Sequence, residues 1–227
     1  MTETIRHSWD LSAREAIALQ KELAGRVQQV SIQRPVRTVA GVDCAFFDQG
    51  RQIVAAAVLM DAQTLDTIAT AYSVSAVHFP YVPGLLTFRE APTELDAIAQ
   101  LPQRPDLLMV DGAGIAHPRR LGIAAHLGLW LGLPTIGVAK SRLFGKHRAV
   151  GQARGSVAEL TDHDEVIGAV LRTRDAVRPL FISVGNCITL EESLKWVLRC
   201  AKGYRLPEPT RAADRVAGQL KTGLTQP

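Results

Sequence analysis

The sequence predicts a mixed-sheet α/β protein, and two stretches carry that prediction. Residues 38–74 contain three apolar segments separated by short polar turns, which is the pattern of an antiparallel meander. Residues 106–140 contain a short apolar run, a glycine-rich turn, a helical pattern and a second apolar run, which is the order of a βαβ unit. Further helix and strand patterns alternate after it, so helices are expected to cover a sheet with both parallel and antiparallel strands.

Length and composition favour a single globular domain over residues 1–227. The chain has 227 residues, of which 47% are hydrophobic and 21% charged. No apolar run approaches the roughly 20 residues of a membrane-spanning helix, and the N-terminus lacks the apolar stretch of a signal peptide. The three cysteines, Cys44, Cys187 and Cys200, show no C-x-x-C spacing. They are therefore expected to be reduced thiols in a cytoplasmic protein that does not bind membranes.

The first half of the chain is expected to form a helix, the meander and a second helix. Ser12 and Glu15 have the spacing of a capping box, which begins a helix that runs to about Gln29. The strands of the meander are expected at 38–47, 53–60 and 64–74. A helix over 85–101 follows, and Pro92 is expected to interrupt it.

The second half of the chain alternates strands and helices around a long basic loop, 141–156. The expected strands are 107–110, 135–139, 165–171 and 179–184, the last two forming a hairpin. The expected helices are 119–131, one that a capping box of Thr189 and Glu192 begins, and one from Thr210 to about Leu220. A flexible tail is expected over 221–227.

Three acids are candidates for the chemistry. Asp43 interrupts an apolar strand, Asp111 ends the first strand of the βαβ unit, and Glu90 lies in a predicted helix. Each has a structural alternative: a tolerated edge acid or salt bridge for Asp43, a turn cap for Asp111, and a surface ion pair with Arg89 for Glu90. Together, carboxylates without a cysteine or histidine cluster suit Mg²⁺ or Mn²⁺, ions that polarise a phosphate and activate a water.

Two further side chains of the βαβ unit lie close to these acids in the predicted fold. Lys140 ends the second strand, and the carboxyl ends of such strands gather the ligands of open α/β sheets. Lys140 would there add positive charge beside a phosphate; the alternative is a solvated lysine. His117 follows the turn after Asp111, where it would either position a water or a phosphate or pack at the start of the helix.

An aromatic residue and a basic loop are candidates for nucleic-acid contacts. Tyr81 lies in a stiff loop between prolines, where it would either insert between bases or cover the core. Residues 140–158 contain several Lys and Arg residues and no acid, among them Arg142, Lys146 and Arg148. Such a loop is either a solvated surface or a contact for a phosphate backbone. The net charge of +4 permits a polyanionic partner without requiring one.

Six segments resemble the motifs of the endonuclease V family, the deoxyinosine 3′ endonucleases. They are 39–43 (VAGVD), 80–90 (PYVPGLLTFRE), 110–122 (VDGAGIAHPRRLG), 137–140 (GVAK), 179–185 (PLFISVG) and 204–211 (YRLPEPTR). The matches are long, position-specific and spread over most of the chain.

The resemblance implies a ribonuclease H-like fold with a central five-stranded mixed sheet flanked by helices. It implies a monomeric endonuclease of DNA repair that uses Mg²⁺, or Mn²⁺ in its place, on single- or double-stranded DNA. The enzyme would hydrolyse the second phosphodiester bond 3′ to deoxyinosine or another deaminated base, leaving a 3′-hydroxyl and a 5′-phosphate. Two alternatives stay open: a ribonuclease that acts on inosine in RNA, and an inosine- or junction-binding protein without catalysis.

By position in the motifs, the resemblance also assigns roles to individual residues. The metal ligands would be Asp43, Glu90 and Asp111, with Asp214 at a place where some members have a histidine. Lys140 would be the catalytic lysine, with His117 beside it in the catalytic group. Contacts to DNA would come from Tyr81, as a wedge, and from Pro83, Arg119, Arg142, Lys146 and Arg148. The pocket for the deaminated base would be lined by Gly84, Leu86, Gly112, Gly114, Ile123 and Leu143.

Overall fold

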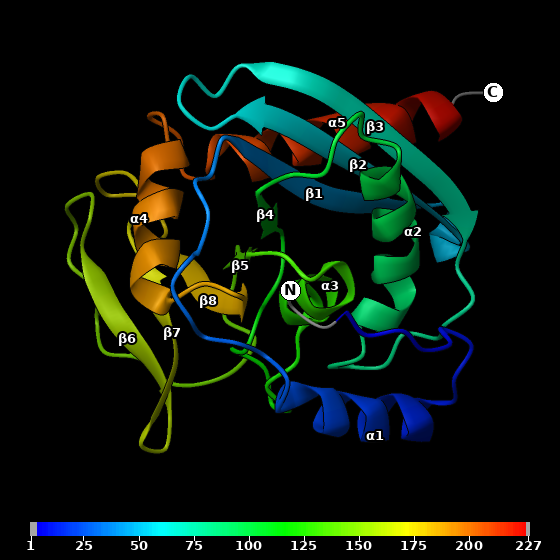
Figure 1. The fold of residues 1–227 in the computed structure, drawn as a ribbon, viewed down its shortest axis with the longest axis horizontal. Helices are drawn as coiled ribbons and strands as arrows, with labels where there is room; N and C mark the ends of the chain where they lie inside the picture. Colours follow the sequence, from blue (N-terminus) through cyan, green and yellow to red (C-terminus); the bar gives the residue numbers. More distant parts are fainter. Residues whose placement is uncertain (1–3, 226–227) are drawn as a thin grey trace.

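A mixed β-sheet of eight strands forms the centre of the computed structural model, which describes residues 4–225 (Figure 1). The strands are β1 (Thr38–Phe47), β2 (Gln52–Asp61), β3 (Thr67–Ala76), β4 (Leu107–Val110), β5 (Thr135–Ala139), β6 (Val157–Asp162), β7 (Glu165–Leu171) and β8 (Leu180–Asn186). The helices are α1 (Ala13–Ala24), α2 (Thr87–Ala99), α3 (Ile123–Leu131), α4 (Leu190–Cys200) and α5 (Glu208–Thr225), with a short 3₁₀ turn, η1 (Asp48–Gly50).

The order of the strands is β3-β2-β1-β4-β5-β8-β7-β6. Strands β1, β2 and β3 form the expected antiparallel meander. Strand β4 lies parallel to β1 and to β5, as the βαβ unit requires. The carboxyl ends of β1, β4 and β5 therefore lie at the same edge of the sheet, and this edge holds the residues described below.

The prediction of five strands was wrong, because β8, β7 and β6 continue the sheet beyond β5. Strands β7 and β8 pair antiparallel as expected, but β6 was not predicted. Its sequence, VAELTD, follows the basic loop directly. A tight turn, with His163 in the left-handed region at φ 53°, returns the chain into β7.

The first two helices differ from their predicted bounds. Helix α1 begins with the expected capping box of Ser12 and Glu15 but ends at Ala24 rather than near Gln29. Helix α2 runs without a break through Pro92. Pro92 has no N–H to donate within the helix. The buried apolar face of α2, which packs on β2 and β3, keeps the helix continuous nevertheless.

The later helices also differ from their predicted bounds. Helix α3 begins at Ile123 rather than at residue 119, because Arg120 adopts a left-handed conformation, at φ 57°, that no helix interior accommodates. The last helix continues to Thr225, so residues 221–225 are helical rather than an irregular tail. Residues 226 and 227 of the expected tail lie outside the described part of the chain. Within residues 4–225, no helix is long and apolar enough to cross a membrane.

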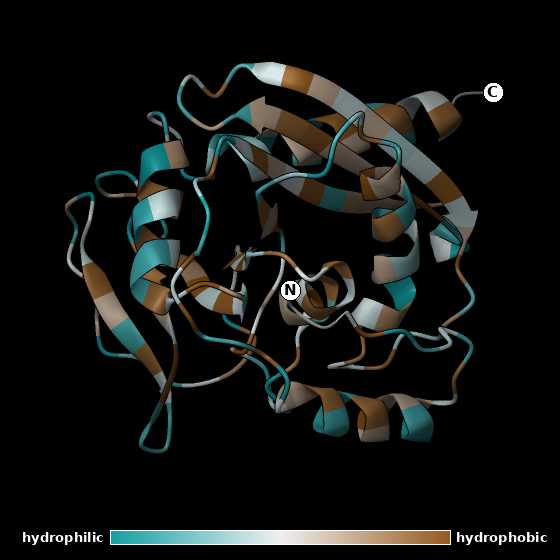
Figure 2. Ribbon diagram, in the orientation of Figure 1, coloured by the Kyte–Doolittle hydropathy of each residue, from teal (hydrophilic) through white to brown (hydrophobic). Residues whose placement is uncertain are grey.

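Helices cover both faces of the sheet. Alternate residues of the strands form two apolar clusters: Val39 and Val58 lie with Ala213 of α5, whereas Ala57 and Leu59 lie with the residues of α2 and α3. Helix α3, in the middle of the view, is mostly apolar in Figure 2. Helix α5 thus packs on one face of β1 and β2, and α2 packs on the other face.

The segment before α1 packs against α3 through two histidines. His126 is fully buried, and its Nε2 lies 2.7 Å from Nε2 of His7. The rings of Trp9 and Trp130 contact the His7 ring in edge-to-face arrangements. Burial, and then the neighbouring His7, lower the pKa of His126 to about 3. His126 is therefore neutral in the folded protein.

We expect His126 to make the protein less stable in mild acid. Its unfolded-state pKa is near 6.5, so below pH 6.5 the unfolded chain takes up a proton that the folded chain rejects. This contribution to stability is complete above pH 6.5 and falls by about 1.4 kcal/mol for each pH unit as the pH drops towards 3. Urea denaturation at pH 7.5 and 5.5 should show a loss of stability that is smaller in His126→Phe. The exposed His163→Asn serves as the control and should behave as the parent; equal pH dependence in His126→Phe would contradict the prediction.

Candidate active site

Three carboxylates converge on one ammonium group at the carboxyl edge of the central strands. Lys140 Nζ lies 2.5 Å from Asp111 Oδ2, 2.5 Å from Asp214 Oδ1 and 3.5 Å from Asp43 Oδ2. One oxygen atom from each of the three acids lies within 4.8 Å of the others. Asp43 and Asp111 are mostly buried, whereas Lys140 and Asp214 remain open to solvent.

The fold explains why these residues meet. Asp43 lies on β1, Asp111 follows β4 and Lys140 follows β5, three neighbouring strands with a common carboxyl edge. Asp214 comes from α5, which begins close to β1. Gly41 permits that approach, because a Cβ there would lie only 2.0 Å from the carbonyl oxygen of Pro209.

Glu90 is not a member of this group and lies on the α2 side of β1, near enough for the charge of Asp111 to raise its pKa. It comes from the first turn of α2, is buried, and forms a second cluster with Cys44 and Glu94 in which ligand atoms again lie within 4.8 Å of one another. Successive strand residues point to opposite faces, so Asp43 faces α5 and Cys44 faces α2. Sequence reasoning did not single out Cys44 or Glu94 for the site; the spacing of Glu90 and Glu94, one helical turn apart, was the available signal.

Burial and mutual repulsion keep the acids at this edge from ionising easily. Burial, and then the charge of Asp111, raise the pKa of Asp43 to about 8, although Lys140 acts in the opposite direction. Burial raises the pKa of Glu90 to about 7. Burial by itself would lower the pKa of Lys140, but the hydrogen bonds to Asp111 and Asp214 outweigh it and the pKa is raised. A cation placed beside these acids would favour their charged form.

The donor set fits a hard divalent cation. Carboxylate oxygens are the ligands that Mg²⁺ and Mn²⁺ prefer, and Asp43, Asp111 and Asp214 offer three of them from different elements. The ammonium of Lys140 is the cation among them in this structure. Pairing between Lys140 and Asp214 was not foreseen from the sequence.

His117 and Arg119 lie in a polar network around the carbonyl group of Gly84. This oxygen accepts hydrogen bonds from Arg119 Nη2 at 2.7 Å, Gln20 Nε2 at 3.1 Å and His117 Nε2 at 3.0 Å. His117 Nδ1 accepts the backbone N–H of Arg119, so its proton is on Nε2. Burial, and then Arg119, lower the pKa of His117 to about 4. His117 thus holds the loop of Gly84 as a neutral donor.

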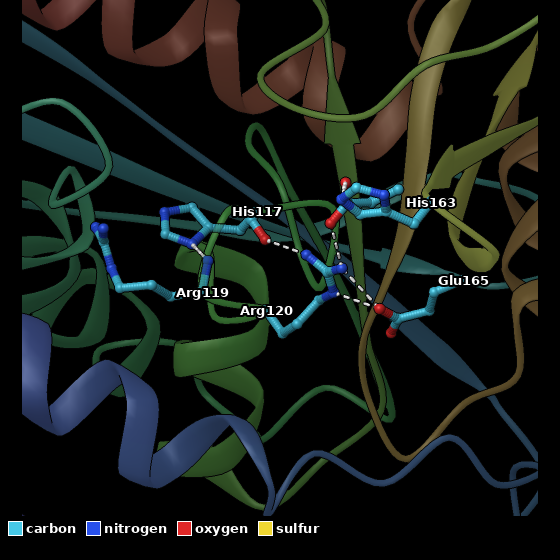
Figure 3. A network of polar contacts seen from close by, with 6 residues as sticks. His117, Arg119, Arg120, His163 and Glu165 are labelled. Carbon is cyan, nitrogen blue, oxygen red and sulfur yellow. Dashed lines mark hydrogen bonds and ion pairs between the residues drawn. The ribbon is translucent and has the colours of Figure 1, made fainter.

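Arg120 ties the same turn to the hairpin of β6 and β7. Its guanidinium contacts Glu165 Oε2 at 2.6 Å and Asp162 Oδ2 at 2.7 Å, and it donates to the carbonyl oxygen of His117 (Figure 3). Figure 3 shows His117 and Arg119 on one side of Arg120, with His163 and Glu165 on the other. The turn that follows Asp111 is therefore fixed from both sides.

The residues predicted to line a base pocket occupy different environments. A Cβ on Gly112 would lie 2.4 Å from Ile123, so these two residues are neighbours. Gly114 packs against the backbone of β8, where a Cβ would lie 1.9 Å from the carbonyl oxygen of Val184. Leu86 and Leu143 are exposed apolar side chains. Gly84 has a φ of 78°, in the region that favours glycine.

The predicted contacts for DNA lie on the surface. Tyr81 is 74% exposed and Pro83 is also exposed, while Phe79 and Leu85 anchor their loop in the core. A tyrosine that covered the core would be buried, so that alternative is wrong.

The basic residues Arg142, Lys146 and Arg148 are exposed as well. The backbone of Lys146 pairs with that of Thr161 in β6. The loop and this strand border a cavity of about 650 Å³, which is lined also by His147, Arg148 and Glu159.

Comparisons with known proteins agree with these features. The family model described as Endonuclease V matches residues 21–215. The Endonuclease V of Azotobacter vinelandii is 51% identical over 211 residues, which cover 93% of this chain and 96% of the relative. The crystal structure of Endonuclease V from Streptomyces avermitilis is 44% identical and superposes with a TM-score of 0.91 over 100% of both chains.

A more distant structure, Endonuclease V of Ciona intestinalis in complex with a 24-mer DNA containing an inosine followed by a ribo-adenosine, is 24% identical with a TM-score of 0.79. It covers 93% of this chain and 98% of that one. The ribonuclease H-like fold is confirmed by these neighbours.

Proposed function

The chain belongs to the endonuclease V family, and on that premise we propose that it is a metal-dependent endonuclease that cuts DNA at deoxyinosine and other deaminated bases. It would hydrolyse the second phosphodiester bond 3′ to the lesion and leave a 3′-hydroxyl and a 5′-phosphate. The observation that carries this proposal is the convergence of Asp43, Asp111 and Asp214 on the ammonium of Lys140.

In this proposal the acids hold Mg²⁺, for which Mn²⁺ can substitute. Asp43, Asp111 and Asp214 would supply oxygen ligands. Glu90, from α2 on the other side of β1, would supply a further one. When bound, the ion polarises the phosphate, activates a water and stabilises the leaving oxygen. Lys140, released from the carboxylates, would place its positive charge beside the phosphate. His117 would keep the Gly84 loop in place rather than exchange protons with substrate, since it is buried and neutral.

A gel assay tests this function. A labelled duplex with a single deoxyinosine should be cut once with Mg²⁺ and left intact with a chelator, and the same duplex without inosine should survive. Asp111→Asn should bind the lesion duplex without cutting it. Equal cleavage of both duplexes would refute lesion specificity, and no cleavage with either Mg²⁺ or Mn²⁺ would refute the enzyme and favour the non-catalytic alternative.

The base pocket follows from backbone groups and small apolar side chains. Gly112 would offer its backbone to a base edge, with Ile123 against it, and Gly84, whose carbonyl group is held by Arg119, Gln20 and His117, would border the pocket. Hypoxanthine lacks the exocyclic amino group of guanine, so a tight pocket can reject guanine by leaving that group unpaired or by a clash. The exposed Leu86 and Leu143 would border the same pocket. Gly114 would fix one side of the pocket by packing against β8.

Tyr81 would act as a wedge that opens the duplex at the lesion. We expect Tyr81→Ala to weaken binding to a deoxyinosine duplex by about tenfold, since base–aromatic stacking is worth about 1–3 kcal/mol. Cleavage of single-stranded deoxyinosine DNA should change less, because there is no duplex to open. Anisotropy and cleavage measurements on both substrates check this. Tyr72, exposed on β3, provides the control Tyr72→Ala, and equal losses on the two substrates would count against the wedge.

The phosphate backbone would be bound by Arg142, Lys146 and Arg148, which are exposed in the loop after β5. Such contacts give salt-dependent affinity without sequence preference. Arg119 would act through the Gly84 loop, because its guanidinium is occupied by Gly84 and Gln20.

RNA is the second candidate substrate. The Ciona relative was crystallised with DNA in which a ribo-adenosine follows the inosine, so a ribonucleotide at that place is compatible with the family. A ribo-inosine strand run beside the deoxyinosine strand in the same assay distinguishes the two activities.

A further inference from the structure

A buried polar cluster lies behind the carboxylates described above, on the α2 face of β1. Glu94 is 1% exposed, and its Oε2 has no hydrogen-bond partner among residues 4–225. Ligand atoms of Cys44, Glu90 and Glu94 lie within 4.8 Å of one another. The Cys44 thiol and the Glu90 carboxyl group are thus close neighbours. An unpaired carboxyl oxygen thus lies beside a thiol and a second carboxyl group.

This cluster contains no positive charge. Across the described chain, no Lys, Arg or His side chain forms an ion pair with Glu90 or Glu94. The other group of acids differs in this respect, because the ammonium of Lys140 lies among them. Arg89, the nearest cation in sequence, donates to the carbonyl oxygen of Phe79 and forms no ion pair with Glu90, although its charge favours the ionised form of Glu90. A buried acid without a cationic partner either stays protonated or coordinates a metal.

We propose that Cys44, Glu90 and Glu94 form a second metal site, selective for a transition-metal dication over Mg²⁺. A thiolate is a soft ligand, whereas Mg²⁺ and Mn²⁺ prefer oxygen, so the sulfur favours Co²⁺ or Zn²⁺. With metal–ligand bonds of about 2.0–2.3 Å, two ligand atoms of one ion lie at most about 4.6 Å apart. The three side chains therefore need only a small contraction to share an ion.

The backbone supports two separate sites. Asp43 and Cys44 are neighbours on β1 and point to opposite faces of the sheet. The first site faces α5 and takes Asp214, whereas the second faces α2 and takes Glu94. Glu90 belongs to both proposals, and it is the group through which the occupancy of one site would affect the other. Access would come from the carboxyl edge of the sheet, where Cys44 is partly exposed.

Cobalt provides a probe that does not depend on cleavage. The complete protein, free of nucleic acid, is titrated with Co²⁺ and its near-ultraviolet absorption is recorded, because only a thiolate ligand gives an intense sulfur-to-cobalt charge-transfer band. We expect the band in the parent and in Cys200→Ser, which removes another buried thiol, at the end of α4. It should be absent in Cys44→Ser. Glu94→Gln keeps the size of the side chain and should weaken cobalt binding at least about tenfold.

Several results would overturn the site. These are a parent protein without the band, a band that persists in Cys44→Ser, or an unchanged cobalt affinity in Glu94→Gln. Circular dichroism checks that each variant is folded. If Cys44→Ser does not fold, the cobalt affinity of Glu94→Gln tests the site instead. If the protein shows the band but cuts no inosine substrate, the proposed function is refuted and the second metal site stands. If the protein cuts with Mg²⁺ but shows no band, the second metal site is refuted and the proposed function stands.

Discussion

Replacing Asp43 with Asn is expected to abolish cleavage while leaving the fold intact. The amide is a poor ligand for Mg²⁺, and a metal ion is worth several kcal/mol of transition-state stabilisation, so the rate should fall by about 10³-fold or more. The fold should tolerate the change, because the backbone N–H of Cys44 donates to Asp43 Oδ1 at 2.8 Å and an amide oxygen accepts it equally well. Loss of a carboxylate that burial and Asp111 disfavour should not lower stability.

The measurements are single-turnover cleavage of a deoxyinosine duplex, anisotropy binding in a chelator, and a urea midpoint. Asp61→Asn is the matched control, because Asp61 ends β2 beside Thr38, at the opposite edge of the sheet from Lys140. Its oxygen caps a turn by accepting from the N–H groups of Gln63 and Thr64. The control should cleave as the parent does. An Asp43→Asn protein that cleaves within threefold of the parent would contradict the proposed metal site.

Local patterns in the sequence were sufficient for the elements that place the site. Three apolar segments with short turns predicted the meander, and the run from Asp106 to Lys140 predicted two parallel strands. Since carboxyl ends of parallel strands share an edge, the proximity of Asp111 and Lys140 followed, and the structure confirms it at 2.5 Å. The parallel pairing of β1 with β4, which brings Asp43 to the same edge, was not predicted from the sequence and comes from the structure.

Local patterns in the sequence did not predict how distant elements pack together. Whether Pro92 breaks α2 depends on the sheet that covers the helix, and β6 is stable only because β7 pairs with it. The separation of Glu90 from Asp43 depends on which face of β1 each helix covers, which no local pattern contains. Glu94 lies one turn after Glu90, which is a weak signal in the sequence; its burial, with Oε2 unpaired, is what distinguishes it in the structure.

Gly41 is the position at which a single methyl group is expected to do most damage to the fold. A Cβ on Gly41 would lie 2.0 Å from the carbonyl oxygen and 2.1 Å from the carbonyl carbon of Pro209. These are backbone atoms at the start of α5, so no side chain can rotate away. In Gly41→Ala the helix must move, and we expect a loss of about 3 kcal/mol, which lowers the melting temperature by about 6–12 °C.

The same change should also reduce cleavage more than the loss of stability explains. Helix α5 carries Asp214, and a displacement of about 1 Å in a catalytic group can cost about 10²-fold in rate. Gly218→Ala is the control on the same helix, because a Cβ there meets no atom within 4 Å. Removing a glycine from a helix interior stabilises by about 0.5–1 kcal/mol, so this variant should melt slightly higher and cleave normally. Thermal melts and single-turnover rates at a temperature where both variants are folded separate the two effects. If Gly41→Ala melted and cleaved as Gly218→Ala does, close packing of α5 on β1 would not be what positions Asp214.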